Sequence, residues 1–572
     1  AQERQWFLWQ LDPGSAAYHV PTALHLRGSL NVVALEQAFQ ALVQRHEALR
    51  TTFVEEGEQT WQVIQPQRAQ VVEQQAVDAH GIAAAVEHEI RRPFDLLNGP
   101  LMRVKLLRVQ PDHHVLVITQ HHIISDGWSM QIIVDELIQF YGAFCAGTEA
   151  ALRELPLQYA DYAAWQRQWM AEGESTRQLA YWREKLGGEQ PVLELPFDFP
   201  RPAEQSLRGA RLDFNLPAEL AFGLQALAQR EQVTLFVLLL ASFQMLLHRY
   251  SGQGDIRVGV PVANRNRMET EGLVGFFVNT QVLRAEFDSQ ASFRDLLQQV
   301  RQSVLDAQTY QDLPFEQLVD ALQPRRSLSH SPLFQVLFNH QNRETGAAQL
   351  PGLSIEGVAW DSGTAQFDLS LDTGEVGGGL AASLTYATDL FQRSTIEQLA
   401  HHWQNLLHAI VSQPEQAVAQ FALLDADERQ TILRDWNSLE LSGTFEGGLH
   451  ELIEAQARKV PDQLAMIFGT ECLDYRQLNA RANRLARRLR ERGVGPEVRV
   501  GVLLPRSVEM VVALLATLKA GGTYVPLDPN YPADRLAYML EDSQARLLLT
   551  DAQGLGGGLE VLQVPSESVD PL

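Results

Sequence analysis

The chain has 572 residues, 46 of them basic and 70 acidic, and its net charge is −24. A single hydrophobic core rarely serves more than roughly 250–300 residues, so we expect two or three folded units. The negative charge argues against nucleic acids and anionic membranes as partners, because both are negatively charged themselves.

The cysteine content points to a reducing compartment, and the hydropathy pattern argues against a membrane span. The two cysteines, Cys145 and Cys472, lie far apart in the sequence, so no disulfide framework is expected. The chain opens at Ala1 without a starting Met or a visible signal peptide, and we expect a fragment of a cytoplasmic protein. Its longest apolar run, residues 233–247, is about 15 residues long, whereas a membrane span needs roughly 20. That run predicts a buried core helix and no membrane partner.

In chain order, the hydrophobic pattern alternates between the period of a helix and that of a strand, which predicts a mixed α/β protein. We expect helices at 33–49, 128–143 and 395–411, and a strand buried on both faces at 115–118. Four prolines between residues 191 and 202 predict a crossing between two lobes. A polar stretch between residues 412 and 446 predicts the main domain boundary. Beyond it, the segments 498–504, 508–519 and 524–527 read as a strand, a helix and a second strand.

The run from His121 to Gly127 carries the strongest chemical signal. The two adjacent histidines end the apolar strand, and because strand side chains alternate between faces, both imidazoles cannot point into one cleft. A metal site fits this spacing poorly, since no third ligand is in view. A pair of satisfied core histidines is the plain structural alternative. Asp126 is placed to bond locally or to form a buried ion pair, and Gly127 permits close approach of a backbone or ligand.

Seven motifs in their usual order make residues 1 to about 430 resemble the condensation domains of nonribosomal peptide synthetases. The motifs lie at 1–9, 45–53, 121–129, 159–165, 274–280 followed by Arg284, 310–316 and 326–333. Tyr310 stands where the family commonly has His or Asn.

The resemblance implies two lobes in a V shape (residues 1–180 and 181–413), each similar to chloramphenicol acetyltransferase. A linker at 414–448 and a truncated adenylation segment at 449–572 would follow. The resemblance also implies that His122 carries the chemistry, that His121 is largely structural, and that Asp126 pairs with an arginine. We expect Arg284 as this partner, with Arg50 as the alternative. Other motif residues, Trp128, Ser129 and Asn279, are expected to support the site.

By the same resemblance, the reaction joins a donor thioester to the α-amine of an acceptor, both carried on phosphopantetheine arms. Upstream and downstream carrier proteins are then the partners, with an adenylation domain in cis, and the condensation domain itself binds no cofactor. The α-amine has a pKa near about 8, so deprotonating it is easy, and holding the two substrates together is worth on the order of 7–11 kcal/mol. His122 would orient the amine, take its proton or stabilise the oxyanion.

Related activities can be weighed from the same motifs. Heterocyclising domains carry an Asp-rich motif in place of the histidine pair, and epimerising domains usually differ after the Asp, so condensation is favoured, with a lean to an L-configured donor. Two alternatives remain, a free-standing acyltransferase with a diffusible acceptor and a silent docking module that recruits a partner.

From about Leu449 the chain resembles the start of an adenylation domain of the acyl-adenylating family, with motifs at 473–478 and 518–529. Lys519 and the glycines after it suggest a phosphate site, but a helix end and turn is the favoured interpretation. ATP and Mg²⁺ would serve only a complete adenylation domain. No Ser/Thr/Gly-rich phosphate loop follows in this sequence, and we expect no adenylation by this segment alone.

Overall fold

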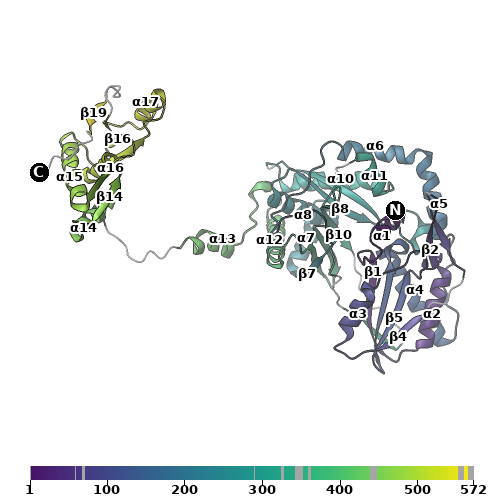
Figure 1. The fold of residues 1–572 in the computed structure, drawn as a ribbon. Helices are drawn as coiled ribbons and strands as arrows, with labels where there is room; N and C mark the ends of the chain where they lie inside the picture. Colours follow the sequence, from purple (N-terminus) through teal and green to yellow (C-terminus); the bar gives the residue numbers. More distant parts are fainter. Residues whose placement is uncertain are drawn as a thin grey trace. The chain divides into compact units, whose positions relative to one another are not determined.

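The computed structural model divides the chain into two compact units, residues 1–435 and 436–572 (Figure 1). It describes residues 2–57, 59–66, 71–288, 290–323, 327–341, 352–358, 363–438, 447–551 and 559–564. The sequence motif at 326–333 is therefore described only from residue 327 onward.

The first lobe of the first unit is a five-stranded sheet with helices on both faces. Its strand order is β11 (Leu353–Gly357), β1 (His19–Gly28), β6 (His113–His121), β5 (Met102–Gln110) and β4 (Val72–Ala76). Helices α2 (Val32–Arg45) and α4 (Gly127–Ala146) share the core of one face, and α3 (Ile82–Arg91) covers the other. The expected strand at 115–118 lies in the middle of β6 and is buried on both faces, which confirms that prediction.

The second lobe is a six-stranded sheet covered by helices on one face. Its order is β7 (Gly209–Leu216), β13 (Gly379–Ala387), β12 (Leu369–Val376), β10 (Val336–Gln341), β8 (Asp255–Val262) and β9 (Asn279–Glu286). The covering helices are α7 (Ala218–Arg230), α8 (Leu235–Ser251), α10 (Phe293–Thr309) and α12 (Arg393–Ser412). Leu238 to Leu247 in α8 are all buried, as expected of a core helix.

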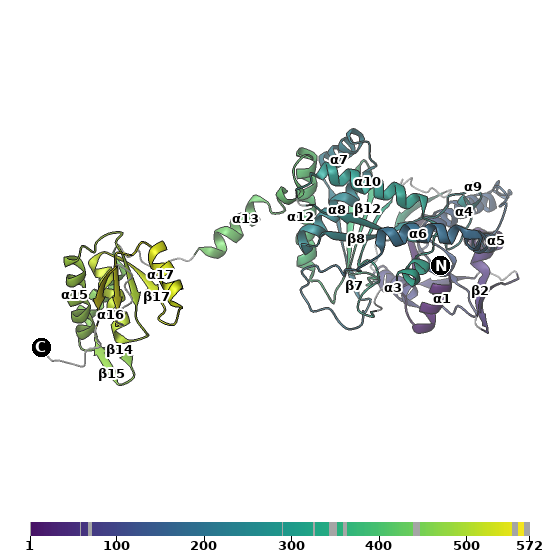
Figure 2. The same cartoon turned by 90° about the horizontal axis from the view of Figure 1, so that it is seen from above.

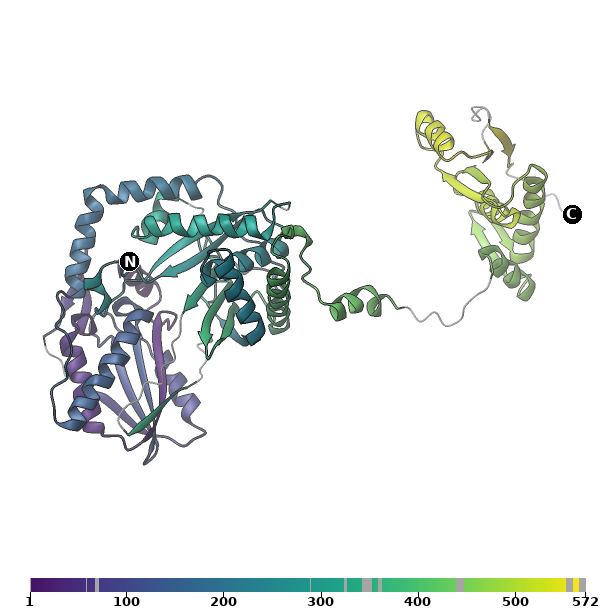
Figure 3. The same cartoon turned by 180° about the vertical axis from the view of Figure 1, so that it is seen from behind.

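Helices and a strand connect the lobes. The chain passes from one to the other through α5 (Tyr159–Trp169), the short η3 (Met170–Glu174) and α6 (Ser175–Leu186), which run along both lobes in Figure 3. Strand β11 then returns from the second lobe to pair with β1. The crossing expected at 191–202 is wrong, because Leu193 and Leu195 are already buried in the second lobe's core. The lobes are also not consecutive in the chain, as a division at residue 180 would have them.

The segment expected to be a linker from residue 414 starts as part of the second lobe. Val418, in the turn η4 (Val418–Gln420), and Phe421 are each 1% exposed and belong to its core, while Arg249 donates to both of their carbonyl oxygens. Helix α13 (Ala426–Leu433) follows and buries none of its residues. The polar linker therefore begins later than the sequence suggested.

The second unit contains a parallel sheet in the order β17 (Thr523–Leu527), β16 (Arg499–Leu503), β18 (Leu547–Thr550) and β19 (Glu560–Gln563). Helices α15 (Tyr475–Glu491) and α16 (Val508–Ala520) pack on one face and α17 (Ala533–Asp542) on the other (Figure 2). Helix α14 (Leu449–Lys459) and the hairpin β14–β15 (Leu464–Phe468, Glu471–Asp474) precede them. The predicted strand–helix–strand unit is confirmed as β16–α16–β17.

Among the described residues, no single helix has the length and apolarity of a membrane span; α7 and α8 reach it only as a pair bent by 106°. The two cysteines are free and exposed.

Candidate functional site

The histidine run lies where β6 ends and α4 begins, on the side of the first lobe that meets the second. His121 is the last residue of β6, and His122 opens a short 3-10 turn, η2 (His122–Ile124). The backbone N–H of His122 donates to the Tyr18 carbonyl oxygen at 2.8 Å, which fixes where the chain leaves the sheet. The two side chains diverge, as strand alternation predicted: His121 is buried, and His122 is half-buried with its ring edge-on to Phe276 of the second lobe at 4.9 Å.

The hydrogen bond made by His122 determines its tautomer. Its Nδ1 lies 2.8 Å from the Ser125 carbonyl oxygen, and because a carbonyl only accepts, Nδ1 carries the proton. Nε2 has no hydrogen-bond partner among the described residues and, in the neutral ring, carries a lone pair. The ring is therefore held in the form that accepts a proton at Nε2.

His121 has the opposite tautomer. Its Nδ1 accepts a hydrogen bond from the Ile123 N–H at 3.1 Å, so its proton is on Nε2. Burial, aided by the neighbouring His19 and His122, lowers the pKa of His121 to about 3. A ring that stays neutral and holds the turn supports the structural role expected for His121.

Asp126 joins the two lobes through a buried ion pair. One carboxylate oxygen caps α4 by accepting from the Ser129 N–H at 2.8 Å, and it also accepts from Arg265 at 3.3 Å. The other accepts from the Phe277 N–H at 3.0 Å. Burial lowers the pKa of Arg265, and the Asp126 charge opposes that change. Asp126 thus does pair with an arginine, but with Arg265.

Both arginines proposed from the sequence are wrong as partners of Asp126. Arg284, on β9, pairs instead with Asp255 at 3.1 Å and Glu286 at 2.7 Å. Arg50 pairs with Glu47 at 3.2 Å. Arg265 was missed because it stands in a loop outside every recognised motif; the available signal was a cation following the apolar strand β8.

The supporting residues of the motifs have separate tasks. The Ser129 hydroxyl donates to the Gly275 carbonyl at 2.9 Å and accepts from the Gly275 N–H and from Arg265. Trp128 is 49% exposed and donates its indole N–H to the Glu271 carbonyl. Asn279 donates to the carbonyls of Gln311 and Leu313, tying β9 to the loop before α11 (Phe315–Leu322). A Cβ on Gly127 would meet nothing within 4 Å, so space is open at that residue.

Gly275 is a packing constraint that the sequence motif did not explain. A Cβ there would lie 2.0 Å from the Tyr159 ring, whose hydroxyl donates to the Phe276 carbonyl at 2.7 Å. Glycine lets the ring of one motif lie against the backbone of another, directly behind Phe276.

One group of potential metal ligands occurs among the described residues, away from the histidine run: His401, Asp425 and Glu428. Asp425 and Glu428 form the capping box of α13, and His401 contacts Asp425 at 2.7 Å. Helix capping accounts for this cluster without a metal.

In the second unit, Lys519 is buried and bonded to Glu454, to Asn479 at 2.7 Å and to Asn483 at 2.9 Å. Helix α16 ends at Ala520 and is C-capped by Gly521, whose φ of 88° is left-handed. The interpretation of this motif as a helix end and turn is confirmed.

Family comparisons divide the chain in the same way. Residues 1–433 match the family described as Condensation domain, and residues 453–570 match AMP-binding enzyme. One of the linear gramicidin synthase proteins of Brevibacillus parabrevis is 45% identical over 560 residues, covering 96% of this chain and 7% of that protein. Tyrocidine synthase 2 of the same organism is 40% identical over 554 residues, covering 97% and 15%. The chain thus spans a small part of the length of these relatives.

Solved structures also align with the chain. A holo four-domain nonribosomal peptide synthetase bound to AMP and glycine aligns with a TM-score of 0.79 and 25% identity, over 98% of this chain and 44% of that one. The X-domain from teicoplanin biosynthesis aligns with a TM-score of 0.69 and 28% identity, over 74% and 96%. In a second structure that X-domain is in complex with OxyB, with a TM-score of 0.67.

Proposed function

Because the chain belongs to the condensation-domain family, we propose that its first unit forms an amide bond between a donor acyl thioester and the amine of an acceptor aminoacyl thioester. The observation that carries this proposal is the fixed tautomer of His122, whose Nε2 has no hydrogen-bond partner in the described part of the chain and can accept a proton. Both thioesters are carried on phosphopantetheine arms of carrier proteins, one upstream and one downstream.

The reaction needs little base strength and much positioning. The amine nitrogen attacks the thioester carbonyl carbon, the C–N bond forms, the C–S bond breaks, and the sulfur leaves as a thiol. The amine gives up one proton, which Nε2 of His122 accepts and returns to the sulfur. An α-amine with a pKa near about 8 is partly neutral at physiological pH, so the larger gain comes from holding two tethered groups in contact.

The rest of the site supports this step from both lobes. The carbonyl of Ser125 orients His122, Asp126 and Arg265 lock the turn onto the second lobe, and Phe276 bounds the ring. None of these supporting groups gains or loses a proton in the proposed reaction. We therefore assign Asp126, Arg265 and His121 as positioning residues and His122 as the catalytic residue.

The test is a condensation assay with two loaded carrier proteins. His122→Ala is expected to lose activity by roughly 10²–10⁴-fold, the usual contribution of general acid–base catalysis, while its unfolding curve stays that of the wild type. His80→Ala, on a turn before α3, is a matched control for removing an imidazole. Wild-type turnover by the His122 variant would refute the assignment.

A second candidate is a silent docking role, favoured by the likeness to the X-domain that was solved with OxyB. That role needs no proton acceptor, so it predicts partner binding unchanged by His122→Ala and no condensation by the wild type. A free-standing acyltransferase instead predicts turnover of acyl-CoA with small amines. The second unit takes no part in these schemes, and we expect no ATP–pyrophosphate exchange from it alone.

A further inference from the structure

The second lobe has a polar outer sheet face, opposite its helices. Register across β10, β12, β13 and β7 places its side chains in three rows. The first row is Leu337, Ser370, Thr385 and Arg211; the second is Asn339, Asp372, Ser383 and Asp213; the third is Gln341, Gly374, Ala381 and Asn215. We call these twelve residues the outer-face groove. The alternate residues on the same strands, Leu212 and Leu384 among them, form the apolar core beneath.

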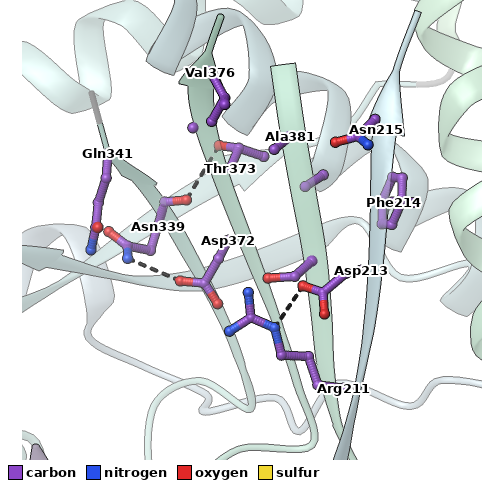
Figure 4. A pocket seen from close by; sticks show the side chains of 13 residues that line it. Arg211, Asp213, Phe214, Asn215, Asn339, Gln341, Asp372, Thr373, Val376 and Ala381 are labelled. Atoms are coloured by element: carbon purple, nitrogen blue, oxygen red, sulfur yellow. Dashed lines mark hydrogen bonds and ion pairs between the residues drawn. The ribbon is translucent and has the colours of Figure 1, made fainter. Parts of the chain in front are cut away.

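The second row brings two carboxylates to either side of a hydroxyl. Asn339 donates to Asp372 at 2.9 Å, and Arg211 donates to Asp213 at 2.8 Å, as Figure 4 shows. Ser383 lies between the two aspartates in the register and is only 3% exposed, yet its hydroxyl has no hydrogen-bond partner among the described residues. These side chains line a cavity of about 240 Å³. The Ser383 hydroxyl is accessible from this cavity and can donate to or accept from a ligand there.

Two small residues leave space in the third row, where Gly374 and Ala381 are register partners. At the other end, Ser370, Thr385 and Leu337 of the first row line a second cavity of about 890 Å³, and Asp372 borders both cavities. The larger cavity lies between the lobes and reaches His19 of β1. Asp372 of the outer-face groove therefore also borders the space between the lobes.

His19 connects that space to the histidine run. It is the register partner of His121, and the two rings are 6.2 Å apart. Its Nδ1 lies 2.6 Å from the Ile90 carbonyl, which holds the ring at the end of α3. His19 therefore borders the larger cavity and also packs against His121.

We propose that the outer-face groove holds the upstream residues of a peptidyl donor, an inference that rests on the proposed amide-forming function. Rows two residues apart are spaced by about 6.6 Å, so three rows span roughly 13 Å, the length of about four extended residues. An aminoacyl acceptor is one residue long, whereas the three rows match about four extended residues. The peptidyl donor is the substrate that carries several residues, so we assign the groove to the donor.

The charges of the groove specify what it accepts best. One arginine faces two aspartates, and amide and hydroxyl groups surround them. Arg211 is itself 41% exposed at its side chain, so it can swing away from Asp213. The groove therefore suits backbone N–H groups and an ammonium or guanidinium side chain beside Asp213, and it disfavours an acidic donor residue there.

The first experiment varies donor length. Ala381→Phe fills the space in the third row, and Ala381→Ser is the matched control that leaves it open. We expect the phenylalanine variant to weaken binding of an unreactive hexapeptidyl-pantetheine amide by about tenfold or more, since a blocked subsite costs at least one good contact of about 1.4 kcal/mol. Binding of the aminoacyl-pantetheine amide is expected to be unchanged. An equal loss of affinity for the hexapeptidyl and the aminoacyl analogue would overturn the assignment of the groove to the peptidyl donor.

Turnover separates this inference from the proposed function. One outcome is that the wild type joins neither donor but binds the longer analogue, and that Ala381→Phe abolishes this binding. The proposed reaction is then refuted, and the assignment of the groove as a peptide-binding site is supported. If the wild type joins both donors and Ala381→Phe slows them equally, the groove fails and the reaction stands.

The second experiment varies charge. Asp213 has a side chain 70% exposed, so Asp213→Lys is expected to fold. It should lower affinity for a hexapeptidyl analogue carrying lysine and raise affinity for one carrying glutamate, each by about two- to fivefold, as for an exposed ion pair. Phe222→Lys, at an exposed position of α7 on the helical side, is the control. No change in the lysine-to-glutamate preference would overturn the assignment of this row.

Discussion

The Asp126–Arg265 pair gives the sharpest prediction about stability. Asp126→Ala removes the N-cap of α4, the acceptor for the Phe277 N–H and the only carboxylate paired with Arg265 among the described residues. Breaking a buried ion pair by deleting one partner costs about 3–5 kcal/mol, because the remaining charge stays desolvated. The lost cap adds about 0.5–2 kcal/mol. Against a typical folding free energy of about 5–15 kcal/mol, a loss of about 4 kcal/mol or more is a large fraction.

The tryptophans provide the assay. Nine of the ten lie before residue 435 and the tenth is Trp436, so tryptophan fluorescence during urea unfolding reports on the first unit. Asp126→Asn keeps the hydrogen-bond acceptor without the charge and should lose less than the alanine variant. Combining it with Arg265→Met should recover part of that loss, since an apolar replacement of a buried pair is often tolerated. A loss below about 1 kcal/mol for Asp126→Ala would contradict the argument, because it is what a surface pair contributes.

Three further predictions concern His121, Gly275 and Lys519. The pKa of His121 is depressed to about 3, so the unfolded chain binds its proton first, and the first unit should lose stability as pH falls from about 6.5 toward 3. His121→Gln should shift acid unfolding, followed by fluorescence, to lower pH; an unchanged midpoint would show that this ring is not buried neutral. Gly275→Ala should destabilise the first unit by about 1–3 kcal/mol through overpacking, with part of the loss relieved by Tyr159→Leu; additive effects would argue against the contact. Lys519→Met should speed limited proteolysis of the second unit, because Glu454 loses its buried partner. If Lys519 served only to bind phosphate, the substitution would leave the rate of proteolysis unchanged.

The local hydrophobic pattern predicted most of the helices and strands, but it did not predict contacts between residues that are far apart in the sequence. The helix at 395–411 and the buried strand at 115–118 follow from periodicity, which each short segment carries by itself. Strand alternation separated the tasks of His121 and His122. The partner of Asp126 could not be found in this way, because Arg265 is 139 residues away and several arginines fit the motif order equally well. The prolines at 191–202 mark an irregular segment, but only packing showed that it lies on the second lobe.

Strand β11 has a consequence for how the protein is made. The first lobe's sheet leaves one side of β1 without a hydrogen-bonded neighbour until residues 353–357 have been synthesised. During translation, some 230 residues emerge between β6 and the strand that completes its sheet. A nascent first lobe therefore presents a bare sheet edge for much of its synthesis, a template for pairing with other chains. For the same reason, a fragment cut after α6 should aggregate, because all of β1 is then a sheet edge; in the complete first unit β11 pairs with Leu24–Gly28 and becomes a shorter edge of five residues.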